Sequence, residues 1–324
     1  MIDFFSSRFQ YTFGPHGPTL RVKSGAMLRV VCPDSDNELS DGTLLSADRR
    51  QSDVAGLVQG NPMAGPIFVE GAVPGDSLAV HIETIELDRA TGQTGLAPGH
   101  GVLPTDLLLG GMNPPTTVPS HLFRWRINVA AQKAHLLNPL GKHGIEVPLD
   151  PFVGCIGVCP QSGQSIPTLL AGPHGGNMDI PAVRPAATIY LPVFVEGGLL
   201  MMGDVHAAQG HGEIIGGAIE TSGMIHCTIV LVKNRALESP RIRAAERIMA
   251  IGVETELRAA IQRAYANLLN WLVADFQMNR WDAYNLLSQV GSILVGGLGA
   301  PPYAVAAAIA IDALPDGVRE MERA

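Results

Sequence analysis

The sequence contains few charged residues and no cluster of lysines or arginines. Its 22 Lys and Arg residues are outnumbered by 30 Asp and Glu residues, which gives a formal net charge of −8 at pH 7. Nucleic acids are bound by basic surfaces, so this charge balance excludes them as expected partners. An acidic protein also repels anions, which favours a neutral substrate over a phosphorylated one.

Cysteine is scarce too, since the 324 residues include only Cys32, Cys155, Cys159 and Cys227. Cys155 and Cys159 are the one close pair, and without a second pair their spacing is a poor match to a zinc site. The sequence therefore predicts structural thiols in a reducing compartment. The first ten residues, MIDFFSSRFQ, have neither a basic start nor an apolar run. We therefore expect no signal peptide and a cytoplasmic location.

Long uninterrupted hydrophobic runs are missing as well. The most apolar stretch, residues 290–314, is interrupted by Gly296, Gly297, Gly299 and two prolines before it reaches the ~20 residues that a membrane span needs. We expect a buried strand or loop there, and no membrane partner.

Turn-forming residues are abundant, with 37 glycines and 24 prolines. Between the turns lie short β-branched runs that predict strands at residues 28–31, 67–70, 78–85, 188–195 and 226–232. The strict alternation over 78–85 predicts that one face of its sheet is wet or interfacial. The pattern over residues 1–237 therefore predicts a β-rich, β-sandwich-like body and not alternating βαβ units.

The hydrophobic period changes after residue 237. Ser239 and Pro240 form a typical helix start, with serine as the cap and proline in the first turn. A stripe of period 3.6 predicts a second helix with the buried positions Leu257, Ile261, Ala264, Leu268 and Leu272. Asn279 can cap a third helix, whose predicted buried face is Ala283, Leu286, Leu287 and Val290. Residues 238–324 are thus expected to be a helical segment with a closing strand, packed on the body as one compact unit.

The polar residues that suit chemistry are concentrated in two short segments. Asp204 and His206 are two apart on a predicted strand, so their side chains project from the same face. The following loop is short and contains two glycines, so it can return Glu213 to that pair at the start of an antiparallel strand. Earlier in the chain, His174 precedes two glycines, and Asn177 follows three residues later.

Imidazole and carboxylate ligands suit a divalent metal ion of the zinc class, whose catalytic sites keep one position open for water. Such an ion lowers the pKa of water toward about 7, and a free carboxylate then serves as the general base. Spacing alone does not separate ligands from base. Asp204 could instead cap a turn, and His206 could be a hydrogen-bonded core histidine. Glu70 ends a predicted strand at a turn, where it is either an active-site acid or an ordinary exposed one.

Signatures of other reaction classes are missing. The sequence contains no G-x-S-x-G nucleophile elbow, and no G-x-G-x-x-G or Walker sequence in a suitable context. Cys227 lies in an apolar predicted strand, which favours an inert buried thiol over a nucleophile.

Four blocks in order resemble the acetamidase/formamidase family and together span most of the chain: residues 60–87, the run HGGNMDIP at 174–181, YLPVFVEGGLLMMGDVHAAQGHGEIIGGAIE at 190–220, and WDAYNLLSQVGSILVGG at 281–297. The resemblance implies a β-rich fold with α+β additions and self-association into a dimer or a higher homo-oligomer. It also implies hydrolysis of a short linear amide, such as formamide or acetamide, to a carboxylate and ammonia.

The same resemblance assigns residues to the site. It implies Asp204 and His206 as ligands of a divalent ion, most consistent with zinc, with His174 as a further ligand, and it places Glu213, Asn177 and Glu70 in the catalytic machinery. One difference concerns the substrate: this chain has His211 where the family usually has Asp, in a Gly-Asp-Gly-Glu sequence. A protein that keeps the fold and binds a metal or a small amide without turnover is the alternative hypothesis.

Overall fold

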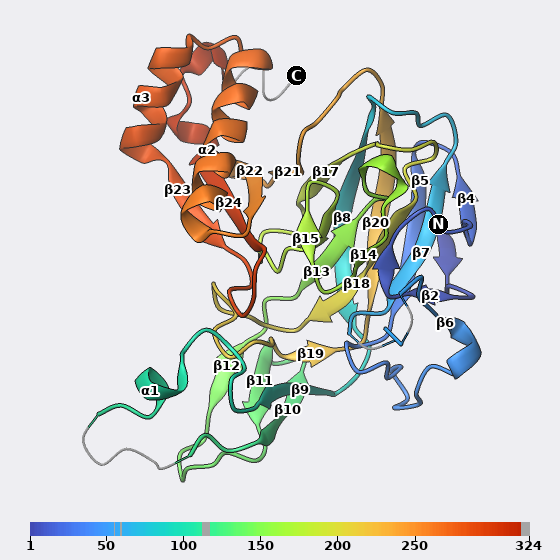
Figure 1. Ribbon diagram of the computed structural model, residues 1–324, viewed down its shortest axis with the longest axis vertical. Helices are drawn as coiled ribbons and strands as arrows, with labels where there is room; N and C mark the ends of the chain where they lie inside the picture. The colour runs from blue at the N-terminus through green and yellow to red at the C-terminus, as the bar shows by residue number, and fades with distance from the viewer. Residues whose placement is uncertain (55, 59, 112–116, 319–324) are drawn as a thin grey trace.

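Two large antiparallel-rich sheets make up most of the computed structural model, which describes residues 1–54, 56–58, 60–111 and 117–318 (Figure 1). The first sheet has nine strands in the order β1 (Ile2–Phe4), β5 (Ala26–Cys32), β20 (Gly223–Val232), β8 (Ser77–Leu87), β17 (Thr188–Pro192), β21 (Arg241–Arg243), β22 (Arg247–Glu254), β24 (Tyr303–Ala310) and β23 (Ser292–Val295).

The second sheet has thirteen strands. Its main path runs through β12 (Glu146–Pro148), β11 (Lys133–Leu136), β10 (His121–Asn128), β9 (Thr91–Leu96), β19 (Glu220–Thr221), β18 (Leu200–His206), β13 (Phe152–Gly157), β16 (Gly175–Asn177) and β15 (Ala171–Gly172). Off this path, β7 (Met63–Val69) pairs with β18 and carries β2 (Phe9–Gln10) and β4 (Leu20–Val22), while β6 (Arg50–Gln51) pairs with β2. A separate pair joins β3 (Thr12–Phe13) and β14 (Ile166–Pro167).

The main hydrophobic core lies between these sheets. Leu78, Val80 and Ile82 of β8 are fully buried in it, as the alternation predicted, while Glu83 on the other face of the strand is exposed. Each of the five predicted strands is found, as β5, β7, β8, β17 and β20, although β7 ends at Val69 and β17 ends at Pro192. The β-rich, β-sandwich-like fold class with α+β additions is therefore confirmed.

The helices are few and short apart from two near the C-terminus. The helices whose bounds fall wholly within the described residues are α1 (Thr105–Leu108), α2 (Leu257–Ala274) and α3 (Arg280–Val290), with single 3-10 turns at Ala47–Arg49, Gln161–Gly163 and Ile311–Ala313. In Figure 1, α2 and α3 lie together at one end of the molecule, over β22 and β24. Within the described residues, no helix has the length and apolar character that crossing a membrane requires.

The helical stripe is confirmed in its central part. Ala264, Leu268 and Leu272 are fully buried against β22 and β24. The cap of α3 is also correct, because the Asn279 side chain accepts hydrogen bonds from the backbone N–H groups of Trp281 and Asp282 at 2.9 and 3.3 Å. The four cysteines are all buried with free thiols, as expected for structural residues.

The helix predicted to start at Ser239 and Pro240 is wrong. This segment leads into β21 instead, and the Ser239 hydroxyl donates to the Ile251 carbonyl at 2.7 Å. Serine and proline favour a helix start only through local effects. Here the backbone of the segment that follows pairs with β17 instead and forms β21. Because β21 to β24 extend the first sheet, we propose that residues 1–237 and 238–318 form one unit.

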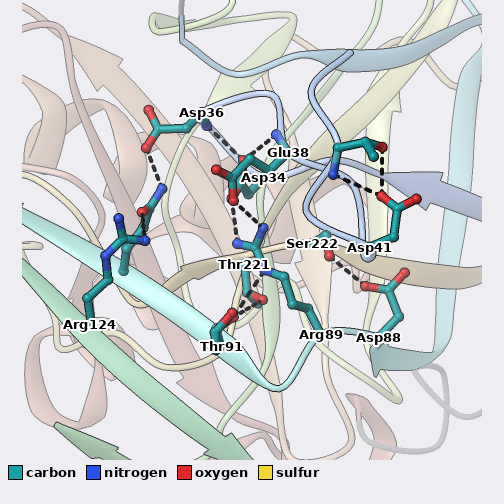
Figure 2. A network of polar contacts seen from close by, with 12 residues as sticks. Asp34, Asp36, Glu38, Asp41, Asp88, Arg89, Thr91, Arg124, Thr221 and Ser222 are labelled. Carbon is teal, nitrogen blue, oxygen red and sulfur yellow. Dashed lines mark hydrogen bonds and ion pairs between the residues drawn. The ribbon is translucent and has the colours of Figure 1, made fainter. Parts of the chain in front are cut away.

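A partly buried polar network links β9 with β19 and with the segment around Asp34 (Figure 2). Arg89 donates from Nη2 to Oδ2 of Asp34 at 2.5 Å, from Nη1 to Oε2 of Glu38 at 2.9 Å, and from Nε to the Thr91 carbonyl at 3.2 Å. The Thr221 hydroxyl donates to the same Thr91 carbonyl at 2.9 Å. The network therefore holds β9 against β19, the strand that begins at Glu220.

Candidate active site

Four carboxylates and one imidazole meet beside β18, and we refer to Asp179, Asp204, His206, Glu213 and Glu220 as the carboxylate–imidazole cluster. Ligand atoms of Asp179, Asp204 and His206 lie within 4.8 Å of one another, and so do those of His206, Glu213 and Glu220. Asp179, Asp204 and His206 are almost completely buried.

The strand β18 supplies the centre of the cluster. Its residues Asp204 and His206 approach to 3.3 Å between Oδ1 and Nε2, so the predicted pair is brought together. The antiparallel register places His206 opposite Glu220 on β19, and their Nε2 and Oε1 atoms are 3.3 Å apart. Glu213 does return to this pair, but it lies in the loop and the next strand begins only at Glu220. A turn at Glu213, closed by a hydrogen bond from the Gly216 N–H at 2.7 Å, delays the strand.

Two glycines make room for the crowded side chains. A Cβ atom at Gly154 would lie 2.6 Å from Oδ2 of Asp204, 2.8 Å from Cε1 of His206 and 2.9 Å from Oδ1 of Asp179. A Cβ atom at Gly297 would lie 2.8 Å from Oδ2 of Asp179 and 3.0 Å from Oε2 of Glu213. The cluster therefore fills space that only glycine leaves open.

The backbone of the cluster is strained. Asp179, Asp204 and Glu213 have positive φ angles of 50°, 61° and 46°, a region that L-residues with side chains seldom occupy. Each such residue costs of order 1–3 kcal/mol, and such residues gather at functional sites where the surrounding structure holds them. Here three residues with positive φ angles supply carboxylates to the same cluster.

Two asparagines orient the carboxylates. Asn61, just before β7, donates from Nδ2 to Oδ2 of Asp204 at 2.8 Å and to Oδ1 of Asn177 at 2.6 Å. Asn177 in turn donates from Nδ2 to Oδ2 of Asp179 at 2.8 Å. Both aspartates thus accept amide hydrogen bonds that fix the direction of their free lone pairs.

Gln209 orients the imidazole. Its Oε1 is 2.9 Å from Nδ1 of His206, and its Nε2 donates to the Asp179 carbonyl at 2.9 Å. Because the amide N–H group is used by that carbonyl, Oε1 must accept from Nδ1–H. The Nε2 atom of His206 then faces the carboxylates, the arrangement in which a second hydrogen bond fixes the tautomer of a metal-binding histidine.

The electrostatics of the cluster are dominated by burial and by repulsion among like charges. Burial raises the pKa of Asp204 to about 6 even though His206 opposes the shift. Burial, together with Glu220 and Asp204, raises the pKa of Glu213 to about 7, again against His206. Burial and the neighbouring Glu213 and Asp204 raise the pKa of Asp179 well above its usual value.

The remaining two groups are shifted toward their charged forms. Burial lowers the pKa of His206, but Glu220 and Asp204 outweigh burial and raise it well above its usual value. Burial raises the pKa of Glu220, but the attraction of His206 holds it below its usual value. The cluster therefore carries an excess of negative charge that one imidazolium does not neutralise.

The donor set fits a divalent metal ion. Oδ1 of Asp179 and Oε2 of Glu220 are buried without a hydrogen-bond partner, and a buried carboxylate oxygen without one is costly. A cation beside them would remove this cost and the charge excess together. One imidazole with several carboxylates is a donor set of the zinc class, so Asp179, Asp204 and His206 form a possible metal-binding group.

Two sequence-predicted residues are not brought to the cluster. His174 belongs to neither close group of ligand atoms among the described residues. It lies in the tight turn between β15 and β16, and its buried ring packs edge-on against Phe13 at 5.1 Å. Burial lowers its pKa to about 4, so the ring is neutral. Both of its ring nitrogens are buried without a hydrogen-bond partner in the part of the chain that the structure describes, and the assignment of His174 as a ligand remains a prediction.

Glu70 also lies away from the cluster. It is exposed just past β7, next to Val69, whose N–H group donates to the Gly197 carbonyl at 3.0 Å. Because β7 and β18 are antiparallel, this is the opposite end of β18 from Asp204, seven residues or about 23 Å away. Glu70 was a candidate because it follows the end of a strand. The antiparallel pairing of β7 with β18 places that strand end far from the cluster.

Four members of the site were given no role from the sequence: Asp179, Glu220, Asn61 and Gln209. Asp179 is two residues beyond Asn177, and Glu220 ends the same segment as Glu213, so local spacing could have suggested both. Asn61 had no such signal, because its contact with Asp204 joins residues 143 positions apart.

Comparison with known proteins matches this description. Residues 160–310 match the Acetamidase/Formamidase family. The chain is 34% identical to a crystallised acetamidase from Yersinia enterocolitica, covering 96% of this chain and 91% of that one with a TM-score of 0.79. A predicted acetamidase/formamidase from Thermoanaerobacter tengcongensis is 27% identical over 95% and 96% of the two chains, also with a TM-score of 0.79. A formamidase of Methylophilus methylotrophus is 30% identical over 252 residues, which span 66% of this chain and 61% of that protein.

The region of this chain that matches the family, residues 160–310, contains the whole carboxylate–imidazole cluster. The likeness to the Yersinia protein extends over nearly the full length of both chains, so it includes the strands that position the cluster as well as the helices near the C-terminus. The chain belongs to the acetamidase/formamidase family.

Proposed function

We propose that the protein hydrolyses a linear amide to a carboxylate and ammonia at the carboxylate–imidazole cluster. The observation that carries the proposal is the convergence of Asp179, Asp204, His206 and Glu213 around Gly154 and Gly297. The names of the related formamidase and acetamidase support the same reaction. In that reaction the carbonyl carbon gains the oxygen of water, the C–N bond breaks, and the nitrogen leaves as ammonia after it takes up a proton.

Glu213 is the proposed general base. Its pKa of about 7 lets it accept a proton from water near neutral pH and then donate that proton to the leaving nitrogen. Its loop position also suits a group that must face substrate, because Glu213 lines an open pocket while Asp179 and Asp204 are buried. Asn177 is assigned the role of orienting Asp179 and, through Asn61, Asp204.

Asp179, Asp204 and His206 are the proposed ligands of a divalent ion, most consistent with zinc. When bound, such an ion acts as a Lewis acid that lowers the pKa of water and polarises a carbonyl group. The hydrogen bond from His206 Nδ1–H to Gln209 leaves Nε2 available to the ion. The Asn61 amide leaves one oxygen of Asp204 free for the same purpose.

A single assay tests this proposal. Purified protein is incubated with formamide, acetamide, butyramide and benzamide, ammonia is measured, and metal content is determined on the same sample. We expect ammonia from at least one amide and about one divalent ion per chain. The variant Asp204→Ala should lose both, whereas the exposed Asp48→Ala should lose neither.

The outcomes separate the hypotheses. Metal without ammonia release from any amide would favour the alternative, a binding protein on the same fold. Full metal content in Asp204→Ala would refute the assignment of the ligands. Self-association remains a prediction, which light scattering on the purified protein tests.

A further inference from the structure

An open pocket adjoins the carboxylate–imidazole cluster and is much larger than formamide or acetamide requires. Its volume is about 520 Å³, and we call it the Trp125 pocket after its largest side chain. Trp125, Val147, Ile215 and Ile219 form its apolar walls. It lies between the loop after β18 and the strands β9 to β12.

The pocket and the cluster share residues. Glu213 lines the pocket and also belongs to the cluster. Gln209 lines it too, and the same side chain accepts the hydrogen bond from His206 Nδ1. A molecule in the pocket is therefore in contact with the proposed general base, so the pocket is the approach to the reacting groups.

Hydrogen bonds and packing hold the side chains of the pocket walls in place. The Trp125 Nε1–H group donates to Oγ1 of Thr94 at 3.2 Å, and the Thr94 hydroxyl donates to the Ala218 carbonyl at 2.5 Å. Thr94 itself is only 7% exposed. Behind the wall, Trp125 and Val147 pack against a small buried core that includes Ile127 and Ile219. The indole is thus held in one orientation over the pocket.

The size of the pocket excludes acetamide as the ligand that fills it. If each of its four heavy atoms occupies the ~30 Å³ that water takes in the liquid, acetamide needs only roughly 120 Å³. Pockets of ~300–1,000 Å³ are those that bury drug-sized ligands, mostly on apolar walls with a few polar groups that set orientation. The Trp125 pocket has mostly apolar walls, and its polar groups include Glu213, Gln209, Asp150 and His211.

We propose that the acyl group of the substrate is apolar and larger than acetyl, an aryl or branched aliphatic group, and that it occupies the Trp125 pocket. The amide group then lies at Glu213, and Trp125 and Ile215 determine specificity. This inference rests on the proposed amide hydrolysis and narrows its substrate class.

The first test is a substrate series assayed by ammonia release with the wild-type protein. We compare kcat/KM for acetamide, butyramide, isovaleramide and benzamide. Each added methylene that is buried should raise kcat/KM by roughly fourfold, and benzamide or isovaleramide should be the best substrate. A series in which acetamide is best, or in which kcat/KM falls as the acyl group grows, would refute the inference and leave amide hydrolysis standing.

The second test uses variants of the pocket. Trp125→Ala should lower the ratio of kcat/KM for benzamide to that for acetamide by at least tenfold, mainly through KM, and Trp125→Phe should restore most of the ratio. Ile215→Trp, at a half-buried loop position that lines the pocket, should lower the same ratio by filling the pocket. The matched control Trp281→Ala changes a tryptophan that is 73% exposed on α3 and should leave the ratio unchanged.

The outcomes are distinguishable. Equal losses for both substrates in Trp125→Ala and Ile215→Trp, at unchanged thermal midpoints, would mean that the pocket does not select the acyl group. An absence of ammonia from every amide would refute the proposed function itself, and the inference with it.

Discussion

Replacing Gly154 by alanine adds one methyl group at the most crowded point of the site. The glycine has no positive φ angle, so alanine fits the backbone and any effect comes from the side chain. The added Cβ atom would lie 2.6 to 2.9 Å from atoms of Asp204, His206 and Asp179. Ordinary van der Waals contacts begin near 3.4 Å, so each neighbour must move by 0.5 to 0.8 Å.

These neighbours have little freedom to move. Asp204 and Asp179 are held by the Asn61 and Asn177 amides, and His206 is held by Gln209. Overpacking of this kind costs about 1–3 kcal/mol of unfolding free energy. A displacement near 1 Å in a reacting group can cost roughly 10² in rate. We therefore expect Gly154→Ala to lower kcat by about 10² and to lower the denaturation midpoint measurably.

The assay combines ammonia release with urea denaturation. Gly144→Ala is the control, because a Cβ atom there would meet nothing within 4 Å, and it should match the wild type in both measurements. Wild-type activity and stability in Gly154→Ala would mean that the three side chains do not close around Gly154 as described.

Two further predictions concern stability. Leu268→Ala removes a fully buried side chain of α2 and should cost about 2–5 kcal/mol in urea denaturation; an unchanged midpoint would contradict the burial. Burial raises the pKa of Asp76, but hydrogen bonds from the Lys233 ammonium and from the Val73 and Asn234 N–H groups outweigh it and hold that pKa below its usual value. The carboxylate therefore stabilises the fold above its unfolded pKa of about 3.9, and this contribution is lost as the pH falls through the folded pKa. Asp76→Asn should cost about 1–3 kcal/mol at pH 7, and the difference from wild type should shrink below about pH 4; a difference that is constant down to pH 3 would contradict this.

Local signals in the sequence predicted local features well. The stripe of α2 and the Asn279 cap depend on residues within a few positions of one another, and both are found. The pairing of Asp204 with His206 and the return of Glu213 were predictable for the same reason. The helix predicted at Ser239 failed because a local cap signal contains no information about the pairing of β21 with β17, about 50 residues earlier in the chain.

The rest of the site depends on contacts that no local pattern contains. Gly154 is essential to the packing only because β13 pairs with β18, which places it between Asp204 and His206. Asn61 reaches Asp204 from a distant segment, and Glu70 is removed from the site by the antiparallel direction of β7. The order and direction of the strands determine the positions of Gly154, Asn61 and Glu70. Local patterns in one sequence do not reveal that order.

We propose that the carboxylate–imidazole cluster cleaves an amide with Glu213 as the general base. The most direct measurement is ammonia release by Glu213→Gln, with metal content and the thermal midpoint determined on the same sample. Glutamine keeps the size of the side chain and its hydrogen bonding but cannot accept the proton. We expect turnover to fall by roughly 10²–10⁴ while metal content and fold persist, and we expect the exposed control Glu246→Gln to match the wild type. Undiminished turnover in Glu213→Gln would show that Glu213 is not the base, and loss of the metal would make Glu213 a ligand instead.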